Sequence, residues 1–214
     1  MSRLLVLIKM LLNLPLRLFS KISVFAIIKK SIIHSTASIQ SGTRFYNSRI
    51  EDYSYISRDC VIVNTIIGKF CSIADNVIIN AGKHPLNFVS SSPVFYSKNN
   101  CLKKCFNEIS YNEYDSTIIG NDVWIGTHAF IKGGISIGDG AVIGAYTIVT
   151  KDVEPYTVIV GNPGRVLKKR FDDDLIKKLL KLKWWSFNED LLRKCSSKMN
   201  NVNEFIDFCE IIKK

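Results

Sequence analysis

The chain contains three histidines, and they limit the acid–base chemistry that its side chains can perform. His84 stands in the segment Asn-Ala-Gly-Lys-His-Pro, and an imidazole there can act as a general base near neutral pH. A surface histidine that caps a turn is the alternative interpretation, and the position alone favours neither. His128 is expected at the surface or in the wall of a pocket, and His34 is expected to be structural.

Six cysteines are further candidates for chemistry: Cys60, Cys71, Cys101, Cys105, Cys195 and Cys209. No two of them have the CxxC spacing, so a zinc site built on paired cysteine motifs is not expected and no metal is predicted. Cys60 and Cys71 occupy positions where a small apolar residue fits a repeated core. We expect six reduced thiols in a cytoplasmic protein.

A repeat of six residues places these side chains. One aliphatic or aromatic residue recurs at this spacing, with short breaks: Ile33, Ile39, Phe45, Ile50, Ile56, Ile62, Ile67, Ile73, Ile79, Ile119, Ile125, Ile131, Ile137, Ile143 and Val149. Turn formers such as Gly, Asn and Asp follow many of them. Six residues suffice for one short strand and a corner, so three faces close a coil of about 18 residues. The repeat therefore predicts a parallel β-helix over residues 33–164.

The repeat is interrupted once, between Ile79 and Ile119. Residues 85–117 contain prolines, three consecutive serines and charged residues, but no repeat. A long loop on a regular scaffold is usually functional. The interruption begins beside His84, which therefore stands between a regular coil and a long loop.

The two ends of the chain hold its excess of positive charge. Residues 1–50 contain eight Lys or Arg and no Asp or Glu. Residues 1–32 are predicted to form an apolar, basic helical segment, and residues 165–214 a helical tail with an N-cap before Leu175. The apolar stretch 3–28 is either a cap on the fold or a peripheral contact with the inner face of an anionic membrane. It lacks the run of about 20 uncharged residues that a spanning helix needs, and no nucleic-acid partner is expected.

Several motifs together resemble the hexapeptide-repeat acyltransferases. They comprise residues 68–73, 82–85, 119–126, 137–145, 149–153 and 161–165. The combination is most similar to the xenobiotic acetyltransferase branch, which includes type B chloramphenicol and streptogramin acetyltransferases and many polysaccharide O-acetyltransferases. The resemblance covers roughly residues 35–187, and it implies that the β-helix is left-handed.

This resemblance implies a homotrimer that binds acetyl-CoA in the cleft between adjacent β-helices. It implies that His84 is the catalytic base, which deprotonates an acceptor hydroxyl that attacks the thioester directly. It also marks six contacts with acetyl-CoA: Thr127, Ala145, Thr150, Lys151, Arg165 and Lys168. The basic members of this set suit the CoA phosphates, although a solvated basic run before a helix is the alternative for residues 165–170.

The acceptor is predicted to be a sugar of a surface polysaccharide or of its lipid-linked precursor. The loop contains several aromatic residues, whose faces suit sugar rings, and its Ser-Ser-Ser-Pro-Val-Phe-Tyr stretch resembles polysaccharide-modifying members. Tyr96 and Trp124 are the candidate pocket residues, and Trp124 at a subunit interface is the alternative.

Other functions remain open at this point. An N-acetyltransferase of a nucleotide-linked amino sugar and an antibiotic acetyltransferase are the alternative enzymes. A non-catalytic binding scaffold would not need His84. A γ-type carbonic anhydrase is not expected, because His34 lies too many coils from His84 and His128 to share a metal.

Overall fold

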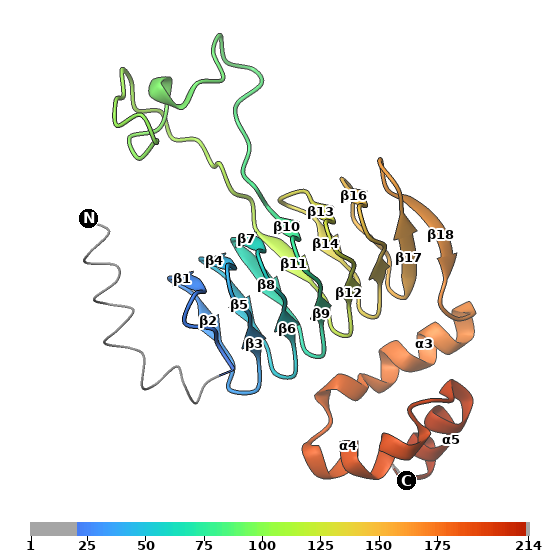
Figure 1. Ribbon diagram of the computed structural model, residues 1–214. Helices are drawn as coiled ribbons and strands as arrows, with labels where there is room; N and C mark the ends of the chain where they lie inside the picture. The colour runs from blue at the N-terminus through green and yellow to red at the C-terminus, as the bar shows by residue number, and fades with distance from the viewer. Residues whose placement is uncertain (1–20, 213–214) are drawn as a thin grey trace.

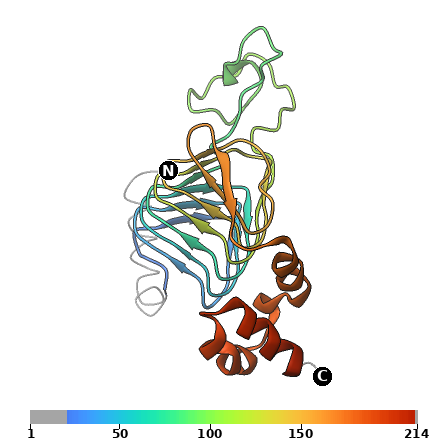
Figure 2. The same cartoon turned by 90° about the vertical axis from the view of Figure 1, so that its right-hand side faces the viewer.

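The computed structural model describes residues 21–212 as a parallel β-helix with one long loop and a C-terminal group of helices (Figure 1). Viewed along its axis, the coil is closed on itself, with the loop on one side and the helices on the opposite side (Figure 2). The predicted fold class is therefore confirmed.

Three faces build the coil, and each is a sheet of short strands. Face A contains β3 (Ser38–Ile39), β6 (Tyr55–Ile56), β9 (Ser72–Ile73), β12 (Trp124–Ile125), β15 (Val142–Ile143), β17 (Thr157–Val160) and β18 (Arg165–Lys169). Face B contains β1 (Ile27–Lys29), β4 (Arg44–Tyr46), β7 (Val61–Val63), β10 (Ile78–Ile79), β13 (Phe130–Ile131) and β16 (Ile148–Val149). Face C contains β2 (Ile32–Ile33), β5 (Arg49–Ile50), β8 (Thr65–Ile67), β11 (Thr117–Ile119) and β14 (Ser136–Ile137).

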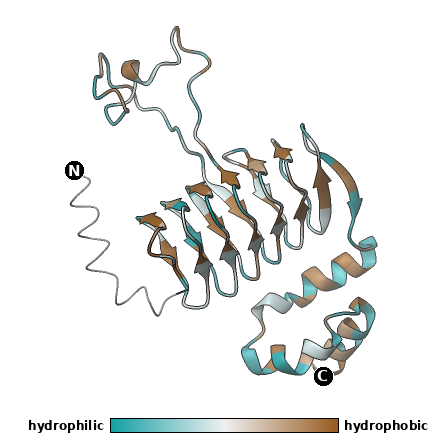
Figure 3. Cartoon of the chain, in the orientation of Figure 1, coloured by the Kyte–Doolittle hydropathy of each residue, from teal (hydrophilic) through white to brown (hydrophobic). Residues whose placement is uncertain are grey.

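The repeated residues fill the interior, as predicted. Every one of them is buried except Ile33, which packs against the core from the first face C strand. Hydrophobic colour accordingly follows the strands (Figure 3). The coil length differs from the prediction in the first half. Stacked residues are 17 apart before the loop, as Asn47 and Asn64 are, and 18 apart in the coils after it, as Asn121 and Asp139 are, until the last coil, where Val142 pairs with Val158. The early coils are shorter because corner 1 uses one residue fewer.

The chain turns at three corners between the faces. Corner 1 joins face B to face C through Asn47 and Asn64, corner 2 joins face C to face A, and corner 3 joins face A to face B through Asn76. A residue with positive φ stands at these turns, which Asn and Gly adopt easily. In two coils before the loop, corner 2 uses aromatic residues at such positions instead, Tyr53 at φ 62° and Phe70 at φ 62°, whereas Asp122 and Gly140 stand there in the two coils after it.

The boundary predicted at residue 32 is wrong for residues 22–32. Ile22 forms a parallel bridge with Ile39, and β1 pairs with β4, so the first coil begins inside the segment that was expected to be helical. The reason is that Ile22 and Ile28 continue the inward repeat and pack on the core. The rest of that segment, including most of the stretch considered for membrane contact, lies outside the described residues. Among those that are described, no helix has the length and apolar character needed to cross a membrane.

The boundary at residue 165 also needs correction. Residues 165–169 form β18, which pairs antiparallel with β17 at the edge of face A, rather than part of a helical tail. The helices that follow are α3 (Asp173–Leu182), α4 (Glu189–Cys195) and α5 (Val202–Ile212), with short 3-10 turns at Trp184–Ser186 and Ser196–Lys198. The predicted N-cap is confirmed, since the Asp172 carboxylate accepts a hydrogen bond from the Leu175 amide at 2.8 Å.

The C-terminal helices pack along corner 2. Trp184 lies 4.9 Å from the ring of Phe70, and the Tyr53 hydroxyl donates to Glu189 at 2.7 Å, so residues from two successive coils hold the helices. Aromatic residues adopt positive φ less readily than Asn or Gly. At this corner, however, they provide the apolar surface on which the tail packs.

Alkylation of cysteines tests this packing. Burial raises the pKa of the Cys60 thiol to about 11 and that of Cys71 to about 12, so both stay protonated at pH 8. We expect a brief iodoacetamide pulse on the folded chain to modify the exposed Cys101 well before either of them, and Cys195 and Cys209 to react only after denaturation. Peptide mass spectrometry measures the order, and early modification of Cys71 would contradict a closed coil.

Candidate active site

The long loop, residues 80–116 with a 3-10 turn at Pro93–Phe95, leaves the coil at corner 1 and is closed at its base. The Lys83 amide donates to the Glu113 carbonyl at 2.9 Å, and the Asn80 side chain donates to the Asp115 carbonyl at 2.6 Å. An ion pair between Lys83 and Asp115 adds to this closure. The two ends of the loop are thus fastened together directly before His84.

His84 is exposed, but two groups of the loop contact one nitrogen of its ring. Its Nδ1 lies 3.0 Å from the Ser91 carbonyl oxygen and 2.7 Å from the Tyr96 hydroxyl. A carbonyl oxygen can only accept a hydrogen bond, so the first contact requires a proton on Nδ1. The same N–H can also donate to the Tyr96 oxygen. Nε2 is then the unprotonated nitrogen, and no described residue forms a hydrogen bond with it, which is the state that a general base needs.

Tyr96 belongs to an aromatic cluster inside the loop. Only 2% of Tyr96 is exposed, and its ring packs edge-on against Phe88 and Tyr111 at centroid distances of 6.2 and 5.2 Å. Burial raises the pKa of its hydroxyl, assisted by the charge of Glu113, so the group stays neutral. Tyr96 was predicted to line the acceptor pocket. Its burial leaves little ring surface for a ligand, and it contacts the imidazole instead.

Three of the predicted acetyl-CoA contacts lie along corner 3 on successive coils. Thr127 follows β12, Ala145 follows β15, and Arg165 pairs with Val160 beside the turn after β17. A Cβ on Gly126 would come within 2.5 Å of the Ala145 amide nitrogen, so the coils meet backbone to backbone here. The surface of corner 3 therefore carries no bulky side chain at this contact.

The other predicted contacts are more dispersed. Thr150 and Lys151 follow β16 and are exposed at the opposite end of face B from corner 3. Lys168 lies further along β18, opposite Val158. Trp124 is 56% exposed on face A, three residues before Thr127. Within one chain, His84 leaves the coil at corner 1, and the structure does not bring it to corner 3.

An aromatic stack at corner 3 was not predicted. The rings of His128 and Tyr146 lie 4.7 Å apart at 10°, and both residues are exposed. Thr127 Oγ1 donates to the Asp75 carbonyl at 2.8 Å and lies 2.8 Å from His128 Nδ1, from which it can therefore accept. The signal in the sequence is the matched spacing of Gly-Thr-His and Gly-Ala-Tyr at 126–128 and 144–146. The stack offers a flat surface beside Thr127.

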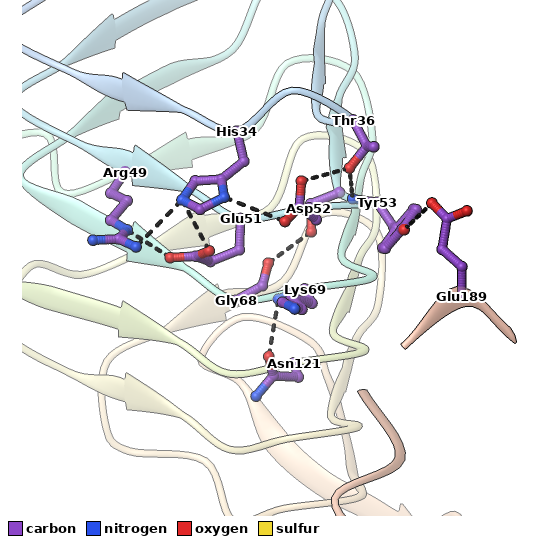
Figure 4. Close-up of polar contacts among 11 residues, drawn as sticks. His34, Thr36, Arg49, Glu51, Asp52, Tyr53, Gly68, Lys69, Asn121 and Glu189 are labelled. Carbon is purple, nitrogen blue, oxygen red and sulfur yellow. Dashed lines mark hydrogen bonds and ion pairs between the residues drawn. The ribbon is translucent and has the colours of Figure 1, made fainter. Parts of the chain in front are cut away.

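His34 lies in a polar network at the first coil (Figure 4). Its Nδ1 is 3.3 Å from Asp52 and its Nε2 is 3.2 Å from Glu51. These three residues could surround a cation, but both carboxylates already have partners. Glu51 pairs with Arg49, whose guanidinium also lies 3.3 Å from His34 Nε2 and would repel a metal ion. Although burial raises the pKa of Asp52, hydrogen bonds from Thr36 and His34 outweigh it and hold that pKa below its usual value.

The comparisons with known proteins agree with this fold. The family model described as bacterial transferase hexapeptide (six repeats) matches residues 116–151. A chloramphenicol acetyltransferase of Klebsiella aerogenes is 39% identical over 163 residues, covering 72% of this chain and 76% of the relative. A probable macrolide acetyltransferase of Lysinibacillus sphaericus is 38% identical over 69% of this chain and 81% of its own length. The galactoside O-acetyltransferase of Escherichia coli K12 is 33% identical over 64% and 57%. The chain therefore belongs to the hexapeptide-repeat acyltransferases.

Removing the Tyr96 hydroxyl tests how His84 is held. We expect Tyr96→Phe to lower kcat roughly five-fold, as the loss of one hydrogen bond would, with little change in the KM for the acyl donor. Tyr111→Phe is the matched control, because Tyr111 packs in the same cluster and forms no hydrogen bond with the imidazole. Equal losses in the two variants, measured by steady-state kinetics, would assign Tyr96 to packing alone.

Proposed function

We propose that this chain is an acetyl-CoA-dependent O-acetyltransferase that acts on a sugar hydroxyl, with His84 as the general base. The observation that carries the proposal is the hydrogen bond from His84 Nδ1 to the Ser91 carbonyl, at 3.0 Å, on an exposed residue whose Nε2 has no hydrogen-bond partner among the described residues. Membership of an acyltransferase family supplies the reaction class.

The reaction needs no covalent enzyme intermediate. Nε2 of His84 takes the proton of the acceptor hydroxyl while the oxygen attacks the thioester carbonyl carbon. Backbone N–H groups near the carbonyl stabilise the tetrahedral oxyanion. The carbon–sulfur bond then breaks, and the imidazolium returns the proton to the CoA thiolate. The proton on Nδ1 stays in place throughout, so the Ser91 carbonyl stabilises the imidazolium at the step where it forms.

In this proposal the acyl donor binds along corner 3. The side chains of Arg165 and Lys168 are exposed, and no carboxylate among the described residues pairs with either of them. They are therefore available to the CoA phosphates. Thr127 and Ala145 line the same corner with small side chains, and the His128–Tyr146 stack offers a planar surface to the adenine. Lys151 and Thr150 border the other end of face B.

A second copy completes the site in this proposal. His84 and the donor residues belong to different corners of one chain, so a donor at corner 3 of one subunit is best met by the loop of its neighbour. The loop also extends away from its own coil (Figure 1). Its apolar residues Leu86 and Val89 are almost completely exposed, which suits a surface covered by another subunit. We propose the homotrimer implied by the family resemblance.

The molar mass of the protein in solution tests the proposed homotrimer. We expect light scattering to give three times the chain mass, and the double variant Leu86→Asp with Val89→Asp to shift the protein toward monomer, because two buried charges without partners oppose association. Lys103→Asp is the control, since Lys103 is exposed on the same loop, forms no ion pair among the described residues, and has a φ of 53° that Asp tolerates. A stable monomer of the unaltered chain would contradict the shared site.

The acceptor pocket is assigned to the loop. A cavity of about 470 Å³ is lined by Asn87, Phe88, Ser90, Phe95 and Asn107, among others. Four of its lining residues, 87–90, directly precede Ser91, whose carbonyl contacts His84. Two amide side chains beside two phenyl rings provide the hydrogen bonds and the apolar faces that a sugar ring uses, and the volume is within the usual range for ligand pockets.

An antibiotic hydroxyl is the second candidate acceptor. Several chloramphenicol acetyltransferases are 39–44% identical to this chain, against 33% for the galactoside enzyme. The proposed mechanism is the same for both acceptors, and a screen of CoA release with galactosides, chloramphenicol and macrolides separates them. Turnover of a drug in preference to every sugar would remove the sugar from the proposal.

Replacing His84 tests the catalytic base. We expect His84→Asn to lower kcat by about 10²–10⁴-fold, the usual range for a lost general base, without unfolding the loop. His128→Asn is the control, because Asn tolerates the positive φ of 59° at that corner. It should change the KM for acetyl-CoA and leave kcat nearly intact. Undiminished CoA release by His84→Asn would end the assignment of this base.

The acceptor pocket is tested through its amides. We expect Asn87→Ala and Asn107→Ala each to raise the KM for the acceptor roughly five- to ten-fold, as the loss of one or two hydrogen bonds would, and to leave the KM for acetyl-CoA unchanged. Asn112→Ala is the control, because Asn112 lies on the same loop outside the pocket and donates to Asp115. Parallel changes for both substrates would argue against this pocket.

A further inference from the structure

A second cavity, of about 180 Å³, lies where the C-terminal helices meet corner 2. It is on the opposite side of the coil from the loop that carries His84 (Figures 1 and 2). Its apolar wall comes from the tail and includes Phe171, Trp184 and Phe205, and its polar end comes mainly from the coil. Nothing in the proposed acetyl transfer uses it.

The charged groups at the polar end are already paired. Arg170 Nη1 donates to Asp122 Oδ2 at 3.1 Å and to the Gly140 carbonyl at 2.7 Å. The guanidinium also lies 5.4 Å from the rings of Tyr156 and Phe171, so aromatic faces hold it on two sides. This ion pair neutralises the polar end of the cavity, which therefore does not attract a charged ligand.

The Tyr156 hydroxyl at the same end of the cavity differs from these paired charged groups. Tyr156 is 1% exposed, and its buried hydroxyl forms no hydrogen bond of normal geometry with any described residue, although the neighbouring Trp184 side chain acts on it and lowers its pKa. Burial raises the pKa of this phenol to about 12, so the group stays neutral and can donate or accept. Buried polar groups are rarely left without a partner unless a ligand or water supplies one.

We propose that this cavity binds a small neutral molecule with one apolar ring and one hydroxyl group, of the size of a phenol. The volume is slightly larger than the roughly 150 Å³ cavity that accommodates benzene in other proteins. A ligand hydroxyl can accept from Tyr156 and donate to Asp122 Oδ1, which has no partner of its own within the described part of the chain. The ring then packs among Trp184, Phe171 and Phe205.

Such a ligand touches the coil and the tail together. Tyr156 and Asp122 belong to the last coils, whereas Trp184 and Phe205 belong to the helices. Binding therefore favours the state in which the tail is docked on corner 2, and it should raise the temperature of thermal unfolding. The effect does not depend on the identity of the acetyl acceptor.

Calorimetric titration of the full chain with phenol and with toluene tests the proposal. We expect phenol to bind at least ten-fold more tightly than toluene, and Tyr156→Phe to abolish this preference without weakening toluene. Removal of an unpartnered hydroxyl should not destabilise the fold, so the variant should keep its unfolding temperature. Val202→Trp, which fills the cavity from α5, should abolish the binding of both probes.

Two outcomes would overturn the proposal. Absence of saturable binding by either probe would mean that the cavity holds only water. A preference for phenol that survives in Tyr156→Phe would place the recognition of the hydroxyl elsewhere. Acetyl transfer by the same preparations is measured in parallel, and it should be unaffected by Tyr156→Phe.

Discussion

The coil interior admits one aliphatic side chain per face in each turn, and this limit determines where everything else can lie. Ile56, Ile62 and Ile67 fill one coil together with the small buried residues Cys60 and Thr65, so no insertion can enter the core. Extra residues must leave at a corner and pack elsewhere. The long loop leaves at corner 1, the helical tail follows corner 2, and corner 3 keeps short turns whose surface stays open. The three corners thereby acquire separate roles on a scaffold whose faces are alike.

The loop itself must hold His84, the proposed base, because it extends away from the coil. It does so with a fastened base and a small aromatic cluster, and the cluster ends in the Tyr96 hydroxyl that contacts His84. The order of the imidazole therefore depends on packing within the loop more than on the β-helix. A neighbouring copy that covers the exposed Leu86 would stabilise the same arrangement. Assembly and the orientation of the proposed base are linked in this way.

Much of the fold could be predicted because the repeat is strong, and its interruption placed His84 beside the loop. The first coil was missed because Ile22 and Ile28 lie within an apolar stretch where helix and strand patterns overlap. The role of Tyr96 could not be predicted, since an aromatic residue in a loop gives no sign of whether its ring is buried. The turns of corner 2 could not be predicted either. Tyr53 and Phe70 are poor candidates for positive φ until the tail that covers them is known.

We infer that the Ser91 carbonyl keeps the proton of His84 on Nδ1 and leaves Nε2 free. Nitrogen-15 NMR of the histidine-labelled chain tests it most directly, with His84 identified by its loss in His84→Asn. When the ring is neutral, we expect Nδ1 to have the chemical shift of a protonated nitrogen and Nε2 that of an unprotonated one. A proton found on Nε2 instead would rule out the proposed base, because that nitrogen could not then accept the proton of an acceptor hydroxyl.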